Sequence, residues 1–205
     1  MKLLKTVLLS LVLFVSLAPA QAQGDWEVNM LRGINPRYPN SGFWKGISST
    51  AKPLSVAVPA GFLLAGLLEH NNTLKQDALV MGGSLVIAAG ATAILKQVVK
   101  RQRPWVTHND IYADDMTDAG YSFPSGHASV AFATAAGLAI RHPKWYIVVP
   151  AYTWATAVGW SRMYLGQHYP TDILMSAGTG IGSAYLSNWL NKKLFPSKPS
   201  LKPKS

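Results

Sequence analysis

Five apolar runs, each followed by a polar segment, restrict the folds that this chain can adopt. They cover residues 54–68, 78–95, 128–140, 146–160 and 173–190. Such runs predict helices, and their Gly, Ala, Ser and Thr residues favour close packing between helices. Several runs are shorter than the ~20 residues that cross a bilayer core, although Trp and Tyr near their ends can extend them. With 49% hydrophobic residues and a mean hydropathy of +0.14, we predict an all-α, transmembrane bundle of about five to six helices. A soluble helical bundle is the alternative.

The N-terminal 22 residues predict export from the cytoplasm. Lys2 and Lys5 precede a short apolar run, which is closed by small residues at 18–22. This order is typical of a cleaved signal peptide, with an uncleaved first membrane helix as the alternative. In both cases the chain beyond it starts outside the cytoplasm. With five spans, the polar segments 96–125 and 161–171 then lie together on the outer side.

These signals divide the chain into four parts. After the signal peptide or first helix (1–22), residues 23–53 form an extracytoplasmic lead-in, with a short amphipathic stretch and no chemistry assigned to it. Residues 54–192 form the catalytic helical domain. Residues 193–205 form a basic, disordered tail that we expect to lie along an anionic inner leaflet.

The polar segment after the fourth apolar run carries a histidine and an aspartate four residues apart, His168 and Asp172. Pro170 suits the first turn of a new helix and would place Asp172 just inside that turn. There the carboxylate can accept a hydrogen bond from one ring nitrogen of His168 and leave the other free to act as a base or nucleophile. Arg162 adds a permanent planar cation suited to phosphate. By itself, the segment is equally well interpreted as a capped helix with a surface His and Arg.

A second polar segment follows the second apolar run. Lys96 and Arg103 are seven residues apart, close to two helical turns, so a continuous helix would project both from one face. Pro104 would then end this helix, and Arg101 would point elsewhere. A helix with a solvated basic end is the alternative interpretation.

The third segment is Pro-Ser-Gly-His at residues 124–127. Gly126 lets the backbone approach a ligand, and the unpaired N–H groups at the start of the following helix form an anion site with Ser125. An ordinary helix start capped by serine is the alternative.

In this order and spacing, the three segments resemble the type 2 phosphatidic acid phosphatase superfamily, which also contains bacterial acid phosphatases and vanadium haloperoxidases. The pattern Lys-x6-Arg-Pro, Pro-Ser-Gly-His and Ser-Arg-x5-His-x3-Asp is present without a substitution. The resemblance implies that His168 forms a covalent phosphohistidine, that Asp172 orients it and that His127 is the general acid. The residues expected to bind the phosphate are Lys96, Arg103, Ser125, Gly126 and Arg162. Neither a metal nor another cofactor is implied.

We therefore predict a metal-independent phosphatase acting on a phosphomonoester or diphosphate of a membrane lipid. The resemblance suggests undecaprenyl diphosphate, lipid A phosphate, phosphatidate or phosphatidylglycerol phosphate. The motifs fall at helix ends, where a bilayer presents headgroups, and we place them on the periplasmic side of a bacterial-type inner membrane. The alternatives are a soluble periplasmic acid phosphatase, a vanadium haloperoxidase and a non-catalytic membrane component.

The net charge and the cysteine content bear on which other classes of protein and of site are possible. The net charge of +10 would suit nucleic acid, but no nucleic-acid-binding module occurs, so we assign the charge to phosphate ligands and membrane-flanking lysines. The expected partners are the lipid phosphate substrate and membrane lipids. The absence of cysteine excludes a thiolate nucleophile, a disulfide and a zinc–thiolate site.

Overall fold

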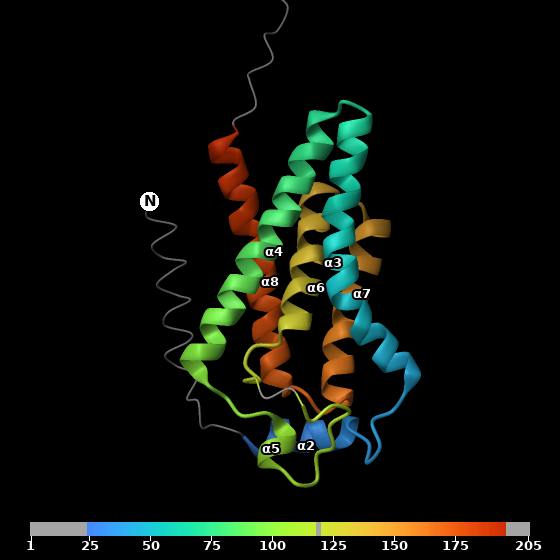
Figure 1. Cartoon of the computed structure of the whole chain (residues 1–205), viewed down its shortest axis with the longest axis vertical. Helices are drawn as coiled ribbons and strands as arrows, with labels where there is room; N and C mark the ends of the chain where they lie inside the picture. The colour runs from blue at the N-terminus through green and yellow to red at the C-terminus, as the bar shows by residue number, and fades with distance from the viewer. Residues whose placement is uncertain (1–23, 118–119, 196–205) are drawn as a thin grey trace, which may run out of the picture.

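The computed structural model describes residues 24–117 and 120–195, and within these ranges it contains helices and loops but no strand (Figure 1). The helices are α2 (Asp25–Ile34), α3 (Gly42–Leu68), α4 (Asn72–Val99), α5 (Pro104–Thr107), α6 (Gly126–Arg141), α7 (Trp145–Tyr164) and α8 (Pro170–Leu194). Each apolar run lies within one of the five long helices, so the predicted all-α bundle is confirmed. The predicted signal peptide and residues 196–205 of the predicted tail lie outside the described residues.

Helix α6 is the centre of the bundle and packs against α3, α4, α7 and α8. Its alanines allow a close approach, and Ala128, Ala131 and Ala135 are fully buried. On α8, a side-chain carbon added at Gly180 would lie 2.5 Å from the Ser129 carbonyl oxygen of α6. Only glycine lets the two backbones come so near at this crossing.

Helix α6 is also short for a central helix. Its 16 residues span about 24 Å at 1.5 Å per residue, whereas α7 has 20 residues and α8 has 25. In Figure 1 its N-terminal end stops inside the bundle, above the lower ends of α7 and α8. The start of α6 is therefore recessed between its longer neighbours.

Large hydrophobic side chains on the outer helices point away from the bundle. Val86 and Ile94 of α4 are 74% and 66% exposed, and Leu174 of α8 is 68% exposed. By length and composition, α3 and the segment Asn72–Thr107, which contains α4, are able to cross a membrane, and 18-residue stretches within them have mean hydropathies of 1.6 and 2.1. A large apolar surface of this kind is unfavourable in water and is accounted for by surrounding lipid.

The polar connections that carry the three motifs meet at one end of the bundle, the lower end in Figure 1, where α2 and α5 also lie. Asn35, which follows α2, holds this end together. Its Nδ2 donates to the carbonyls of Tyr112 and Tyr164, both at 2.8 Å, and its Oδ1 accepts from the Tyr112 N–H at 2.8 Å. The long loop before α6 is thereby tied to α2 and to the end of α7.

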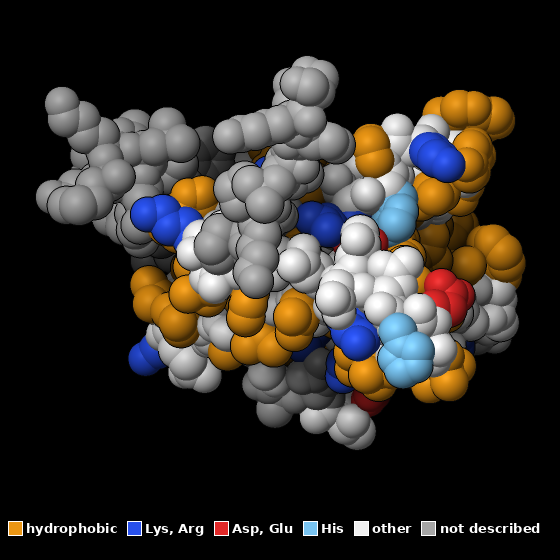
Figure 2. Space-filling model, turned by 90° about the horizontal axis from the view of Figure 1, so that it is seen from above, with side chains coloured by type: hydrophobic (Ala, Val, Ile, Leu, Met, Phe, Trp, Pro, Cys, Tyr) orange, Lys and Arg blue, Asp and Glu red, His pale blue; other side chains and the backbone are white. Residues whose placement is uncertain are grey.

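The opposite end of the bundle has its own ionic cluster. Buried Asp77 of α4 accepts a hydrogen bond from Arg141 Nε at 2.5 Å and lies 3.1 Å from His142 Nε2. These contacts fix the C-terminal end of α6 to the first turns of α4. Figure 2, viewed onto this end, shows Lys, Arg and His side chains with hydrophobic side chains around them.

Candidate active site

The first motif does not form the continuous helix that its spacing predicts. Helix α4 ends at Val99, and Lys100 adopts a left-handed conformation with φ of 51°. Pro104 begins α5 instead of ending α4, because proline fits the first position of a helix and holds the preceding residue extended. The prediction that Lys96 and Arg103 share one helical face is therefore wrong. Arg103 instead lies in the extended segment between the left-handed Lys100 and the start of α5.

Both basic residues of this motif nevertheless reach the loops at the motif end of the bundle. Arg103 is buried, and its Nε donates to the Gly120 carbonyl at 2.9 Å. Its Nη1 donates to the main-chain carbonyl of Gln167 at 3.1 Å and to Gln167 Oε1 at 3.0 Å. Lys96 Nζ donates to the Tyr121 carbonyl. Arg103 thus bonds to the residue that precedes His168.

The second motif forms the recessed start of α6. Ser125 is the N-cap residue, and its Oγ accepts from the Ala128 N–H at 3.5 Å. Its carbonyl accepts from Ser176 Oγ of α8 at 3.0 Å, which holds the start of α6 against the first turns of α8. A side-chain carbon at Gly126 would meet only Thr92 Cγ2, at 4.0 Å, so the backbone here is open to a ligand. His127 follows in the first turn and is half-buried.

The third motif forms a histidine–carboxylate pair, as its sequence predicts. Pro170 begins α8, and Asp172 lies in the first turn, where its Oδ2 accepts from the Tyr169 N–H at 2.9 Å. The same Oδ2 lies 3.5 Å from His168 Nδ1. Both side chains are almost completely buried. The carboxylate is therefore placed to hold a proton on Nδ1, which leaves the lone pair of the ring on Nε2.

The surroundings of His168 keep its ring neutral. The pKa of His168 is lowered from 6.5 to about 4, chiefly by burial and also by the cations Arg162 and Arg103, against the opposing effect of Asp172. Arg162 is itself buried and donates from Nη1 to Ser48 Oγ of α3 at 2.9 Å. A neutral imidazole beside two arginines is suited to attack an anionic phosphorus centre.

Two buried charges at this site were missed by the sequence analysis. Arg101, expected to point elsewhere, donates from Nη1 to Asp172 Oδ1 at 2.8 Å and to Thr171 Oγ1 at 2.7 Å. Its Nη2 donates to Glu27 of α2, which is 1% exposed. Glu27 lies in the stretch to which no chemistry was assigned. The one signal for it is an acidic residue on the face of α2 that also carries buried Val28.

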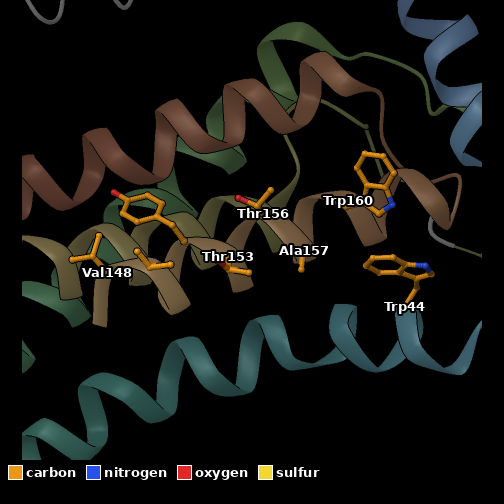
Figure 3. A pocket seen from close by; sticks show the side chains of 8 residues that line it. Trp44, Val148, Thr153, Thr156, Ala157 and Trp160 are labelled. Carbon is orange, nitrogen blue, oxygen red and sulfur yellow. The ribbon is translucent and has the colours of Figure 1, made fainter. Parts of the chain in front are cut away.

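An apolar groove of about 600 Å³ runs between α3 and α7 (Figure 3). Its lining residues are Trp44 of α3 and Val148, Val149, Tyr152, Thr153, Thr156, Ala157 and Trp160 of α7. The two tryptophans face each other at one end of it. The same two helices are joined by the hydrogen bond between Arg162 and Ser48, so the groove adjoins a cation of the site.

No group of three or more His, Asp or Glu side chains placed to hold a metal occurs among the residues that the structure describes.

The motif end of this helical bundle thus holds a buried histidine beside a carboxylate and two buried arginines, while the outer helices are apolar. Residues 77–196 match the model of the PAP2 superfamily, and the chain belongs to that superfamily. The family predicted from the three motifs is therefore confirmed.

Named relatives are phosphatases. The chain is 35% identical to an undecaprenyl-diphosphatase of Sulfolobus acidocaldarius over 100 residues, 49% of this chain and 47% of the relative. It is 30% identical to a lipid A 4'-phosphatase of Bacteroides thetaiotaomicron over 165 residues, 76% of this chain and 73% of the relative. The chain spans about half the length of the first curated relatives that it matches. These relatives support the predicted enzyme class, a phosphoric ester hydrolase.

The fold is that of a solved membrane protein. The crystal structure of a transmembrane PAP2-type phosphatidylglycerolphosphate phosphatase from Bacillus subtilis covers 95% of this chain and 98% of its own, with a TM-score of 0.67 and 24% identity. This likeness shows that the two proteins share a fold, and the apolar outer helices of this chain are suited to a membrane.

Proposed function

We propose that this protein is a membrane phosphatase that removes a phosphate group from a lipid phosphate or diphosphate without a metal ion. The observation that carries the proposal is the buried, neutral His168, held by Asp172 and bordered by Arg103 and Arg162. A phosphoryl group needs its negative charge held while a nucleophile attacks in line, and this arrangement supplies both requirements.

The reaction follows from these positions in two steps. His168 Nε2 attacks phosphorus, the P–O bond to the lipid breaks, and His127 protonates the departing oxygen. A water molecule then gives its proton to His127 and attacks the phosphohistidine, which releases inorganic phosphate and restores both histidines. Lys96, Arg103 and Arg162 balance the charge of the equatorial oxygens throughout.

The groove between α3 and α7 favours a lipid over a water-soluble ester. Arg162 lies two residues from Trp160 on α7, and Ser48 lies one helical turn from Trp44 on α3. A molecule with a phosphate at one end and a hydrocarbon chain at the other therefore fits the site and the groove at once. Undecaprenyl diphosphate, lipid A phosphate, phosphatidate and phosphatidylglycerol phosphate all have this form.

A panel of purified lipid phosphates tests this function. Detergent-solubilised protein with EDTA present should release phosphate from at least one of these lipids, and His168→Ala should abolish the release. p-Nitrophenyl phosphate, which has no hydrocarbon chain, should be a poorer substrate. Absence of hydrolysis from every lipid and soluble ester, or strict dependence on an added metal, would contradict the proposal.

We also propose that the chain is exported by its N-terminal segment and that the site faces the periplasm. Because the chain has no cysteine, single cysteines report their side of the membrane without a background signal. In intact cells, Met116→Cys in the loop at the motif end should react with a membrane-impermeant maleimide. Lys144→Cys at the opposite end should react only after the membrane is opened. The reverse pattern would overturn this orientation.

A further inference from the structure

Glu27 and Arg101 form a buried ionic chain that ends on the Asp172 carboxylate. Glu27 Oε1 accepts from Arg101 Nη2, and Arg101 Nη1 donates to Asp172 Oδ1 at 2.8 Å. Thr171 Oγ1 bridges the same pair, donating to Glu27 Oε2 at 2.5 Å and accepting from Arg101 Nη1 at 2.7 Å. The Arg101 guanidinium also stacks on the Tyr169 ring, 3.8 Å from its centroid. All three charges are almost completely buried, so solvent screens them weakly.

Arg101 has two opposing effects on the neighbouring pair. By bonding Oδ1, it sets the rotation of the carboxylate so that Oδ2 faces His168 Nδ1. By lying next to the carboxylate, it also cancels most of the negative charge that His168 would otherwise experience. A fully neutralised Asp172 would orient the ring but would not stabilise the positive charge that develops on it as Nε2 bonds to phosphorus.

Glu27 removes this conflict by charge alone. Arg101 and Asp172 sum to zero, and with Glu27 the cluster carries one net negative charge. We propose that Glu27, acting through Arg101, is a positioning residue that restores to Asp172 the charge needed to stabilise the phosphorylated His168 ring. This inference rests on the proposed phosphohistidine chemistry, and it gives α2, which precedes the first long helix, a part in catalysis.

The charged groups that act directly on the His168 ring are Asp172 of α8, Arg162 of α7 and Arg103 of the segment before α5. Glu27 and Arg101 reach the ring through their ionic chain to Asp172. Replacing Glu27 or Arg101 leaves all the others in place. A change in the His168 titration in these variants is therefore assigned to the altered charge of the cluster.

The test compares three variants of the full chain in detergent micelles. Glu27→Gln removes the outer negative charge and should move the His168 titration to lower pH, on the order of one pH unit. Arg101→Gln should move it to higher pH, because Asp172 and Glu27 are then uncompensated. The double variant restores the net charge of the native cluster and should titrate near the wild type. The titration is read by ¹⁵N NMR of histidine-labelled protein, with His168 assigned from His168→Gln.

The kinetic result expected for Glu27→Gln is a fall in kcat of about tenfold, the counterpart of one pH unit, with KM almost unchanged. The matched control is Asp110→Asn, which breaks the exposed ion pair between α2 residue Arg32 and the outer loop. This variant should alter neither the titration nor kcat. Thermal unfolding in detergent shows that each variant is folded.

Shifts of the same sign in Glu27→Gln and Arg101→Gln, or no shift in folded Glu27→Gln, would overturn the inference. If Arg101→Gln does not fold because two buried carboxylates are left without their cation, Glu27→Gln decides, since it keeps the Arg101–Asp172 ion pair. The double variant, which leaves Asp172 as the single charge of the cluster, adds its titration where it folds. The NMR titration needs no substrate. A wild type that hydrolyses no lipid phosphate would therefore count against the proposed function, while the titration still tests the charge of the cluster.

Discussion

Replacing Asp172 with asparagine should greatly lower the activity, although the two side chains have the same number and arrangement of heavy atoms. Both oxygens of the carboxylate face donors: Oδ1 accepts from Arg101, while Oδ2 accepts from the Tyr169 N–H and faces His168 Nδ1. An asparagine must turn its NH2 group toward one of these two sides. Turned toward His168, it forces Nδ1 to accept, moves the ring proton to Nε2 and removes the nucleophilic lone pair. Turned toward Arg101, it sets its own N–H donors against the guanidinium and removes the ion pair between Arg101 and residue 172.

The electrostatic loss has a similar consequence for the rate. For unit charges 3.5 Å apart, an effective dielectric constant of about 20 gives an attraction of about 4.7 kcal/mol between the carboxylate and a positively charged His168 ring. This free energy corresponds to roughly three orders of magnitude in rate. Because Arg101 offsets part of the carboxylate charge, we expect kcat of Asp172→Asn to fall by about 10²- to 10³-fold.

The assay is phosphate release from the best lipid of the substrate panel, in detergent, at saturating substrate. Asp110→Asn, a substitution of the same kind at an exposed carboxylate, serves as the control and should retain full activity. A folded Asp172→Asn with kcat within tenfold of the wild type would show that His168 does not depend on this carboxylate for its tautomer or charge. The reasoning about the pair would then be refuted.

Three further predictions concern pH, packing and the groove. Because the pKa of His168 is lowered to about 4, its ring should stay neutral at pH 5.5, where an unshifted histidine would be only about one-tenth neutral. The fall of kcat/KM on the acid side that is assigned to His168 should therefore have its midpoint near pH 4. The same lowered pKa means that the unfolded chain binds a proton before the folded one does, so stability should decrease as the pH falls from 6.5 to about 4 and should not depend on this group above 6.5. Gly180→Ala should lower the free energy of unfolding by about 1–3 kcal/mol and with it the thermal unfolding temperature, because the added methyl group meets the α6 backbone. The control is Gly182→Ala, whose added methyl group has no neighbouring atom within 4 Å, and it should leave the unfolding temperature unchanged or raised. Trp160→Ala should raise KM for a long-chain lipid phosphate and leave KM for p-nitrophenyl phosphate unchanged, and equal effects on both substrates would exclude the groove as the site of the chain.

Local chemistry explains what could be predicted from the sequence. The apolar runs locate the five long helices because a helix that faces either lipid or the central helix needs apolar side chains along its length. The His168–Asp172 pair was predictable because Pro170 marks the start of a helix and places both residues within one turn of each other. In both cases the signal lies within a few residues of the structure that it predicts.

The rest of the site depends on contacts between distant segments. Regular helical spacing placed Arg101 away from Arg103, but α4 ends at Val99 and the chain turns at the left-handed Lys100, beyond which Arg101 bonds to Asp172. Glu27 reaches the same cluster from a helix separated from Arg101 by two long helices of the bundle. A buried acid on a short amphipathic helix has no partner within its own segment, so its role becomes visible only in three dimensions.

The start of the short central helix lies deeper in the bundle than the lower ends of α7 and α8 (Figure 1). A headgroup that reaches the first N–H groups of α6 must leave bulk water before it reacts, and the buried guanidinium groups of Arg103 and Arg162 then take over the solvation of its oxygens. We therefore expect lipids to be distinguished by headgroup size, because a linear diphosphate can reach this depth end-on more readily than a phosphate carried on a bulky disaccharide.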